Sequence, residues 1–94
     1  MTKDPICEIA GIFARSRDED LIAGFLRQIL TDDESRAVAL RWQLVRMLYD
    51  RVPQREIARR LGVSLCKITR GSRELKRRDG AFSRILKAEE TTHG

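Results

Sequence analysis

Two arginines and a glycine have the residue types and surroundings to bind a small molecule. Arg41 lies in a mainly apolar stretch and has no carboxylate three or four positions away. Its neighbours at those spacings are Ala37, Val38, Leu44 and Val45. A guanidinium in such a setting either extends to solvent or meets an anion or a flat ring from elsewhere. Arg70 stands directly beside Gly71 in a second run of helical spacing, and we take Arg41, Arg70 and Gly71 as candidate ligand residues.

Gly71 allows two interpretations. Within a helix, glycine costs about 1 kcal/mol relative to alanine, so a glycine there needs a reason. Position 71 falls near the inward face of its helix, where a missing side chain would leave a notch for a ligand. Alternatively, the helix ends at Gly71 and the glycine is its C-cap. The sequence leaves both interpretations open.

The stretch from Gln54 to Lys76 must position Arg70 and Gly71, and it has the pattern of a helix-turn-helix. A first helix ends just before Gly62, which can take the positive φ that reverses the chain. Ser64 is a suitable N-cap for the second helix, which in this motif enters the major groove of DNA. The alternative is an ordinary helical hairpin.

The charge of this region favours nucleic acid. Residues 51–78 hold ten basic residues and two acidic ones, a net charge of +8, whereas the rest of the chain carries −3 of the total of +5. Such a block attracts phosphate and releases counterions. The alternative, a solvated arginine-rich face, usually interleaves acids four positions away, and most of the basic residues here lack one.

Composition excludes several classes of function. The 94 residues make one domain at most, with enough apolar residues, 41%, for a small core. No apolar run approaches the roughly 18 residues of a membrane span, and no signal peptide is evident. Cys7 and Cys66 lack metal or redox spacing, which is typical of reduced, cytoplasmic thiols. With His93 as the one histidine, and without a nucleophile–base pair or phosphate loop, we expect no metal site, no cofactor and no enzyme.

The periodicity predicts an all-α fold without strands. Thr31 and Glu34 have the spacing of a capping box before the longest helix, Asp18 and Asp20 are N-cap candidates before the second, and Pro53 ends the third. Predicted helices cover residues 5–16, 21–29, about 32–50, 53–61, 65–77 and 81–90, with a turn at 79–80 and a loose end at 91–94. The third helix is apolar on more than one face, which favours an interlocked dimer over a compact monomer.

A family resemblance rests on the second half of the chain. Ile68-Thr-Arg-Gly-Ser72, with Leu75-Lys76 after it and Gln54-Arg-Glu-Ile57 before it, closely resembles the tryptophan repressor family. Leu30-Thr31 and Arg41 match as well, and the resemblance covers roughly residues 21–76. It implies a six-helix helix-turn-helix subunit in an intertwined homodimer. It also implies a repressor of the bacterial cytoplasm, activated by L-tryptophan and controlling genes of tryptophan biosynthesis or uptake.

The resemblance also implies roles for particular residues. The indole would lie between Arg41 and Arg70, with its carboxylate on Arg70 and Gly71 providing room for the ring. Its ammonium would meet main-chain carbonyls near Gln28 and Leu30 of the partner chain, close to Thr31. The residues expected near double-stranded operator DNA are Arg55, Ser64, Leu65, Cys66, Lys67, Thr69, Arg73 and Lys76.

The resemblance divides a single domain of residues 1–94 into three parts. Residues 1–52 would form the dimerisation helices, residues 53–78 the helix-turn-helix that binds DNA, and residues 79–94 a C-terminal helix and tail. Two residues depart from the family. Lys67 stands where the family usually has a small hydroxyl or amide residue, and Glu74 stands where it has a small residue beside the ligand. Glu74 could pair with Arg70 and compete with the ligand carboxylate. The connection from Asp50 to Gln54 is one residue short, with Pro53 in place of a capping hydroxyl. Two rivals follow: a relative that binds DNA constitutively or senses another ligand, and a small non-enzymatic interaction module.

Overall fold

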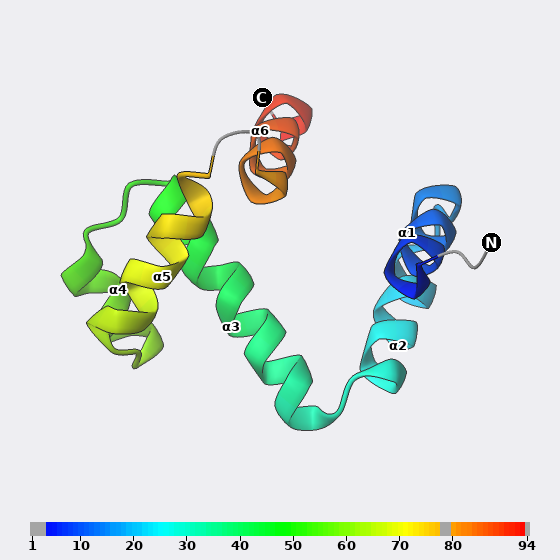
Figure 1. The fold of residues 1–94 in the computed structure, drawn as a ribbon, viewed down its shortest axis with the longest axis horizontal. Coiled ribbons are helices and arrows are strands. Elements are labelled where there is room, and N and C mark those ends of the chain that lie inside the picture. Colours follow the sequence, from blue (N-terminus) through cyan, green and yellow to red (C-terminus); the bar gives the residue numbers. More distant parts are fainter. Residues whose placement is uncertain (1–3, 78–79, 94) are drawn as a thin grey trace. The chain divides into compact units, whose positions relative to one another are not determined.

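A computed structural model describes residues 4–77 and 80–93, with side chains through residue 90. These residues form helices and no strands, which confirms the all-α prediction (Figure 1). The helices are α1 (Pro5–Arg15), α2 (Glu19–Ile29), α3 (Asp32–Tyr49), α4 (Gln54–Leu61), α5 (Leu65–Leu75) and α6 (Ala81–His93). The chain divides into two compact units, Met1–Arg36 and Ala37–Gly94. The functional division at residues 52 and 78 stays a prediction.

The N-terminal unit begins with two well-capped helices. The Asp4 side chain accepts a hydrogen bond from the Ile6 amide at 3.0 Å, and Pro5 occupies the first helical position, where its missing N–H costs nothing. Asp18, rather than Asp20, caps α2 by accepting from the Leu21 amide at 3.1 Å. No residue of α1 or α2 is buried. These helices are therefore defined by local signals and do not enclose a core.

The long helix α3 starts at the predicted capping box. The Glu34 amide donates to Thr31 Oγ1 at 3.1 Å, and the Thr31 amide donates back to Glu34 Oε1 at 2.8 Å. Within α3 only Leu44 and Val45 are buried, whereas Val38 is 48% exposed and Trp42 36%. Most of the apolar residues of α3 are therefore not buried.

The end of α3 differs from the expectation that Pro53 stops it. Arg51 adopts the left-handed conformation with φ of 64°. The Val52 amide donates to the Met47 carbonyl and the Arg51 amide to the Leu48 carbonyl, both at 3.0 Å. These two bonds are those of a Schellman motif, so Arg51 reverses the chain. Pro53 then stands at the N-cap of α4 without a side-chain hydrogen bond.

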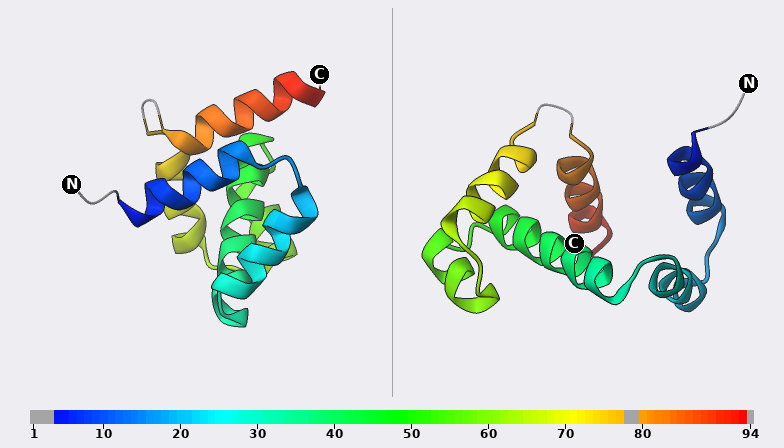
Figure 2. Two further views of the ribbon diagram at one scale, coloured as in Figure 1. Left: turned by 90° about the vertical axis from the view of Figure 1, so that its right-hand side faces the viewer. Right: turned by 60° about the horizontal axis from the view of Figure 1, so that its bottom comes forward.

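The core of the C-terminal unit joins α3 to the helix-turn-helix. Ile57 of α4 and Ile68 of α5 are fully buried and form one cluster with Leu44 of α3. The partly buried residues packed on this cluster are Met47, Leu48, Val52, Ala58, Leu61 and Val63. Figure 2 shows α4 and α5 beside the C-terminal half of α3. This packing fixes α5 against α3, which positions the candidate ligand residues.

Helix α6 is anchored at both ends. The Ser83 hydroxyl donates to the Leu75 carbonyl at 2.7 Å and so satisfies a carbonyl at the end of α5. The Tyr49 hydroxyl at the end of α3 donates to Glu90 Oε2, also at 2.7 Å. The loose end predicted from residue 91 is wrong as far as His93, because no proline or glycine interrupts the helix before Gly94. The predicted turn at 79–80 lies partly outside the described residues, as does Gly94.

Candidate DNA-reading helix and ligand pocket

The helix-turn-helix predicted from Gly62 and Ser64 is confirmed. Gly62 has φ of 63° and ψ of 35°, and its amide donates to the Ala58 carbonyl at 2.9 Å, which closes α4. The Ser64 hydroxyl accepts from the Lys67 amide at 3.4 Å and caps α5. α5 ends at Leu75, two residues before the predicted end.

The residues expected near DNA all lie on the surface. Leu65, at the start of α5, is 61% exposed although it is apolar. The Thr69 hydroxyl donates to the Leu65 carbonyl at 2.9 Å, which leaves its lone pairs free to accept from a ligand. The eight exposed residues are Arg55, Ser64, Leu65, Cys66, Lys67, Thr69, Arg73 and Lys76. Their exposure meets a requirement for DNA contact, and the contact itself stays a prediction.

Acidic residues neutralise a different set of cations. Glu56 pairs with Arg59 and, at 2.8 Å, with Arg60, both on α4. Hydrogen bonds from Arg59 first and Arg60 second lower the pKa of the Glu56 carboxyl to about 2. Glu74 pairs with Arg77 at 3.3 Å. The prediction that most basic residues of 51–78 lack an acidic partner thus holds for some of them, and not for Arg59, Arg60 and Arg77.

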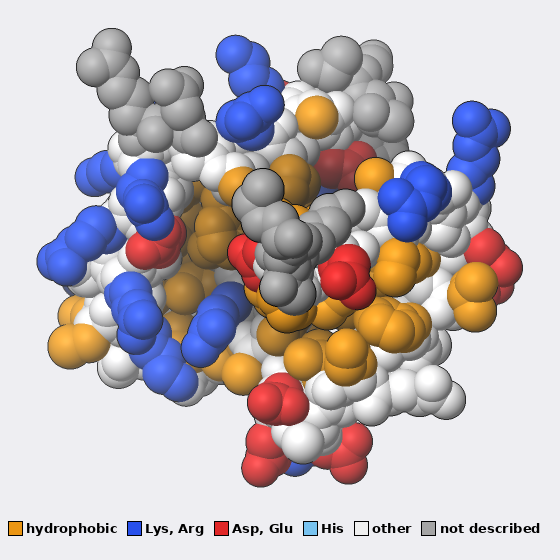
Figure 3. Space-filling view, turned by 45° about the vertical axis from the view of Figure 1, so that its right-hand side comes forward, with side chains coloured by type: hydrophobic (Ala, Val, Ile, Leu, Met, Phe, Trp, Pro, Cys, Tyr) orange, Lys and Arg blue, Asp and Glu red, His pale blue; other side chains and the backbone are white. Residues whose placement is uncertain are grey.

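Among the described residues, the cations expected near DNA have no ion-pair partner. These cations are Arg55, Lys67, Arg73 and Lys76. Figure 3 shows blue side chains gathered along the left-hand edge, where α4 and α5 lie in Figure 1. Unpaired, exposed cations on these helices can neutralise phosphates without first breaking an internal pair.

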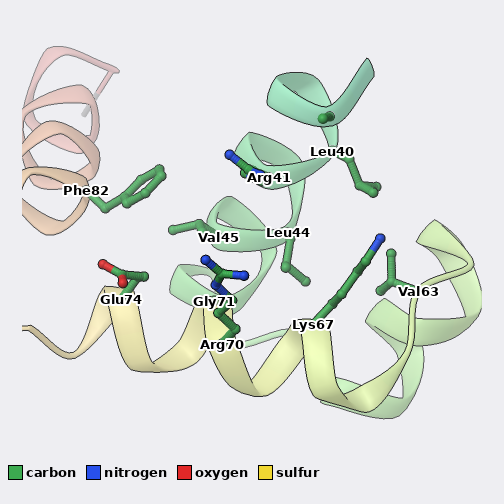
Figure 4. Close-up of a pocket in the computed structure, with 11 residues that line it drawn as sticks. Leu40, Arg41, Leu44, Val45, Val63, Lys67, Arg70, Gly71, Glu74 and Phe82 are labelled. Carbon is green, nitrogen blue, oxygen red and sulfur yellow. The ribbon is translucent and has the colours of Figure 1, made fainter. Parts of the chain in front are cut away.

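A pocket of about 390 Å³ lies between α3, α5, the turn after α4, and the start of α6 (Figure 4). Its lining residues are Ala37, Leu40, Arg41, Leu44, Val45, Val63, Lys67, Arg70, Gly71, Glu74 and Phe82. The volume falls in the usual range for small-molecule sites, and charged groups surround an apolar floor. The pocket can therefore hold a small ligand that has both apolar and charged groups.

The candidate ligand residues of this unit meet in that pocket. Arg41 comes from α3 and Arg70 from α5, and neither forms an ion pair with another described residue. A guanidinium offers a flat face for stacking on an aromatic ring and a fork of N–H donors for a carboxylate. Two guanidiniums on opposing helices can hold both parts of an aromatic acid.

Gly71 lies inside α5 and has no positive φ, so the C-cap interpretation is wrong. A Cβ added there would stand 3.0 Å from Leu44 Cδ2, 3.3 Å from Leu44 Cγ and 3.4 Å from Leu48 Cδ1. The space that a side chain would take is thus already filled by α3. Gly71 permits the close approach of α5 to α3, in addition to lining the pocket.

One charged pocket residue, Lys67, has no predicted role in the pocket, because the resemblance places it near DNA. Glu74 lies at a position that the family has beside the ligand, and it does line the pocket. The ion pair that Glu74 forms is with Arg77 and not with Arg70. Positions 67, 70, 71 and 74 have the spacing of a single helix face, so the sequence alone could have placed Lys67 beside Arg70 and Gly71 in the pocket. The contribution of Phe82 from α6 had no such signal.

Gln28, Leu30 and Thr31 belong to the N-terminal unit. Gln28 lies in the last turn of α2, and Leu30 is its C-cap, with an amide that donates to the Leu26 carbonyl at 3.0 Å. The carbonyls of a last helical turn have no amide partner within their own helix, so they are available to a donor such as an ammonium group. Thr31 is committed to the capping box of α3.

The described residues contain neither a membrane-spanning helix nor a cluster of metal-binding side chains. Within them, none of the helices is both long and apolar enough to cross a membrane. The same part of the chain holds no group of three or more histidine, cysteine or acidic residues that could bind a metal ion.

Comparisons with known proteins give several relatives of one kind. The Trp operon repressor homolog of Actinobacillus succinogenes is 48% identical over 66 residues, which are 69% of this chain and 65% of that protein. The homolog of Haemophilus influenzae is 44% identical over 71 residues, 74% of this chain and 70% of that protein. The homolog of Chlamydia trachomatis is 35% identical over 77 residues, 81% of this chain and 82% of that protein.

The match thus spans just under two thirds of the Actinobacillus protein and somewhat more of the other two. No solved structure matches the chain. A family model described as Trp repressor protein matches residues 9–90, which is most of the sequence. This chain therefore belongs to the Trp repressor protein family, a family of DNA-binding regulators rather than enzymes.

Proposed function

We propose that this chain is a homodimeric repressor whose binding to operator DNA is activated by L-tryptophan. In the bacterial cytoplasm it would control genes of tryptophan biosynthesis or uptake. One observation carries the proposal: the pocket is bounded by α3 on one side and by α5, the candidate reading helix, on the other. A ligand in this pocket contacts the helix that enters DNA and the helix that supports it.

The lining of the pocket supports L-tryptophan as the ligand. The indole stacks between the guanidiniums of Arg41 and Arg70, and the carboxylate takes the N–H donors of Arg70. Leu40, Leu44 and Val45 provide the apolar floor that the ring requires. The ammonium meets last-turn carbonyls near Gln28 and Leu30 of a second copy of the chain.

The incomplete burial of apolar residues supports the second copy. α1 and α2 contain no buried residue, although their sequences are amphipathic. The large apolar residues left exposed on the first three helices are Ile6, Ile12, Leu21, Leu26, Ile29, Val38 and Trp42. Burial against a two-fold related copy removes this surface from water and places two reading helices in successive major grooves.

The coupling between ligand and DNA follows from this arrangement. The ligand bridges α3 and α5, so it lowers the free energy of the one orientation of α5 in which both helices contact it. If that orientation is also the one that fits the major groove, ligand and DNA strengthen each other by the same factor. Arg55, Lys67, Arg73 and Lys76 then supply phosphate attraction, which is present with or without ligand.

Calorimetric titration of the chain with L-tryptophan is the first test. We expect saturable binding of one ligand per chain, and at about 100 times Kd a gain of about 2.7 kcal/mol in the free energy of unfolding. The second test selects duplexes from a randomised pool and compares their affinity with and without L-tryptophan. Selected DNA should contain a palindrome and bind at least about tenfold more tightly with ligand, as in typical allosteric coupling.

The rival functions predict other outcomes. Palindromic DNA bound equally well with and without L-tryptophan identifies a constitutive regulator, or one with another ligand, and the acidic Glu74 in the pocket is the observation that favours this rival. No sequence preference in the selected pool identifies an interaction module that only touches DNA.

A further inference from the structure

We propose that Glu74 makes the pocket selective for a ligand with a free ammonium group, that is, for an amino acid over its des-amino analogue. This inference rests on the proposed function, because it concerns the same pocket. In the proposed function, neutral main-chain carbonyls of a second copy accept hydrogen bonds from the ligand's ammonium group. Glu74 would add a charged acceptor for the same ammonium group, from the chain that forms the pocket.

The first support is the place of Glu74 among the pocket residues. Lys67, Arg70, Gly71 and Glu74 follow one another at intervals of three or four residues and line the pocket from one face of α5. Glu74 is the one acidic residue among the described lining residues. Figure 4 shows its carboxylate beyond Arg70, toward Phe82. α5 thus presents two cations to the pocket, Lys67 and Arg70, followed by the carboxylate of Glu74.

The second support is the way in which the carboxylate of Glu74 is held. Arg77 Nη1 donates to Glu74 Oε2 at 3.3 Å, and the Glu74 side chain is 45% exposed. Oε1 has no hydrogen-bond partner among the described residues. Arg70 stands four positions before Glu74, yet the two form no ion pair in the described part of the chain. Arg70 thus stays available for the ligand carboxylate, and Glu74 Oε1 for its ammonium.

The charges of the pocket make this acceptor selective. L-tryptophan and a des-amino acid such as indole-3-propionate have the same carboxylate, which Arg41 and Arg70 attract and Glu74 repels. Only L-tryptophan also has an ammonium group, which the Glu74 carboxylate attracts. A hydrogen bond between charged groups at a half-exposed site changes affinity by about tenfold, the low end of its usual range.

The test compares the Kd values of L-tryptophan and indole-3-propionate by calorimetry. These ligands have the same ring and carboxylate, and only the first has the ammonium. The wild-type chain should prefer L-tryptophan, and Glu74→Gln should reduce that preference about tenfold. Glu56→Gln is the matched control: it makes the same chemical change on α4, outside the pocket lining, and should leave the preference unchanged.

Each other outcome has a definite meaning. An unchanged preference in Glu74→Gln overturns the inference and leaves the proposed function intact, because L-tryptophan still binds. Wild-type preference for indole-3-propionate also overturns the inference alone. Binding of neither ligand overturns the proposed function as well. Glu74→Asp keeps the charge and should keep most of the preference, and a loss as large as that in Glu74→Gln would overturn a role for charge.

Discussion

Replacing Gly71 by alanine sets two physical effects against each other. Gly71 is in the middle of α5, so an alanine gains up to about 1 kcal/mol of helix propensity. The new Cβ, however, stands 3.0 Å from Leu44 Cδ2 and 3.3 Å from Leu44 Cγ. Leu44 belongs to the buried cluster and cannot rotate away without disturbing that packing. The sign of the stability change depends on which effect is larger.

The contact distances favour a net loss of stability. Inserting a methyl group into a packed core costs about 1–3 kcal/mol. Subtracting the propensity gain leaves a net destabilisation of up to about 2 kcal/mol. L-tryptophan affinity should fall too, because Leu44 lines the pocket and its displacement by the new methyl group changes the shape of that lining. Gly71→Val adds two further methyl groups to a Cβ that already contacts Leu44 and Leu48, and it should abolish binding.

Urea unfolding of four proteins separates the two effects: wild type, Gly71→Ala, Leu44→Ala and the double variant. All are measured in one buffer with sucrose, which favours folded states, because Leu44→Ala alone costs about 2–5 kcal/mol. In the Leu44→Ala background the obstructing atoms are gone, so adding Gly71→Ala should stabilise. Gly24→Ala in α2 is the control for propensity, because its new Cβ meets no side chain or other described segment within 4 Å beyond its chain neighbours and the backbone of its own helix.

The double-mutant cycle also gives the result that refutes the reasoning. If Gly71→Ala changes the free energy of unfolding equally in both backgrounds, contact with Leu44 is not the reason for the glycine. If Gly71→Ala stabilises the wild-type chain as much as Gly24→Ala does, α5 does not approach α3 as closely as the structure describes.

Three further predictions concern α3, α5 and α4. Arg51→Gly removes the strain of a left-handed non-glycine residue and should raise the free energy of unfolding by up to about 1 kcal/mol; a lower value in urea unfolding would contradict it. Lys67→Ala should weaken all DNA sequences about equally and lower the salt slope by about one unit per subunit. A loss confined to one base position would assign Lys67 to a base edge. Arg59 and Arg60 hold the pKa of Glu56 at about 2, below its ordinary value of 4.5. The pairing therefore stabilises the fold above pH 4.5, and this contribution is lost as the pH falls from 4.5 toward 2. In acid titrations Glu56→Gln should flatten the pH dependence of stability in that window, and an unchanged slope would mean that the pairing adds nothing.

Local signals made the helix starts predictable. Asp18, Ser64 and the reciprocal pair of Thr31 and Glu34 act within four residues of themselves, so their roles depend on little beyond their neighbours. The turn at Gly62 has the same local character. These features fixed the order and approximate bounds of the helices.

The end of α3 shows where local signals fail. Arginine is an uncommon residue for a left-handed C′ position, so nothing in its type marks Arg51 as the residue that reverses the chain. Pro53 gave the stronger signal, so the sequence assigned the end of the helix to Pro53, whereas the chain reverses at Arg51, just after Tyr49. The hydrogen bonds from Arg51 and Val52 to α3, and the packing of Val52 on the core, decide the geometry instead.

The candidate site was predictable in part. Arg41, Arg70 and Gly71 stood out because each is unusual for its local surroundings, and the structure brings them to one pocket. Their ligand role stays a prediction. The close contact of Gly71 with Leu44, and the place of Phe82 in the lining, depend on how separate helices pack. Periodicity identifies the inward face of a helix but not what lies opposite it.

Helix α5 both lines the pocket and carries the residues expected near DNA, and this has a consequence for how such a regulator evolves. Its pocket residues, Lys67, Arg70 and Glu74, alternate along one short helix with the exposed residues expected near DNA, such as Thr69 and Arg73. On these predicted roles, a substitution that changes ligand choice lies within one helical turn of a position that changes operator choice. Selection for a new effector would then act on the same short helix that carries the predicted DNA contacts.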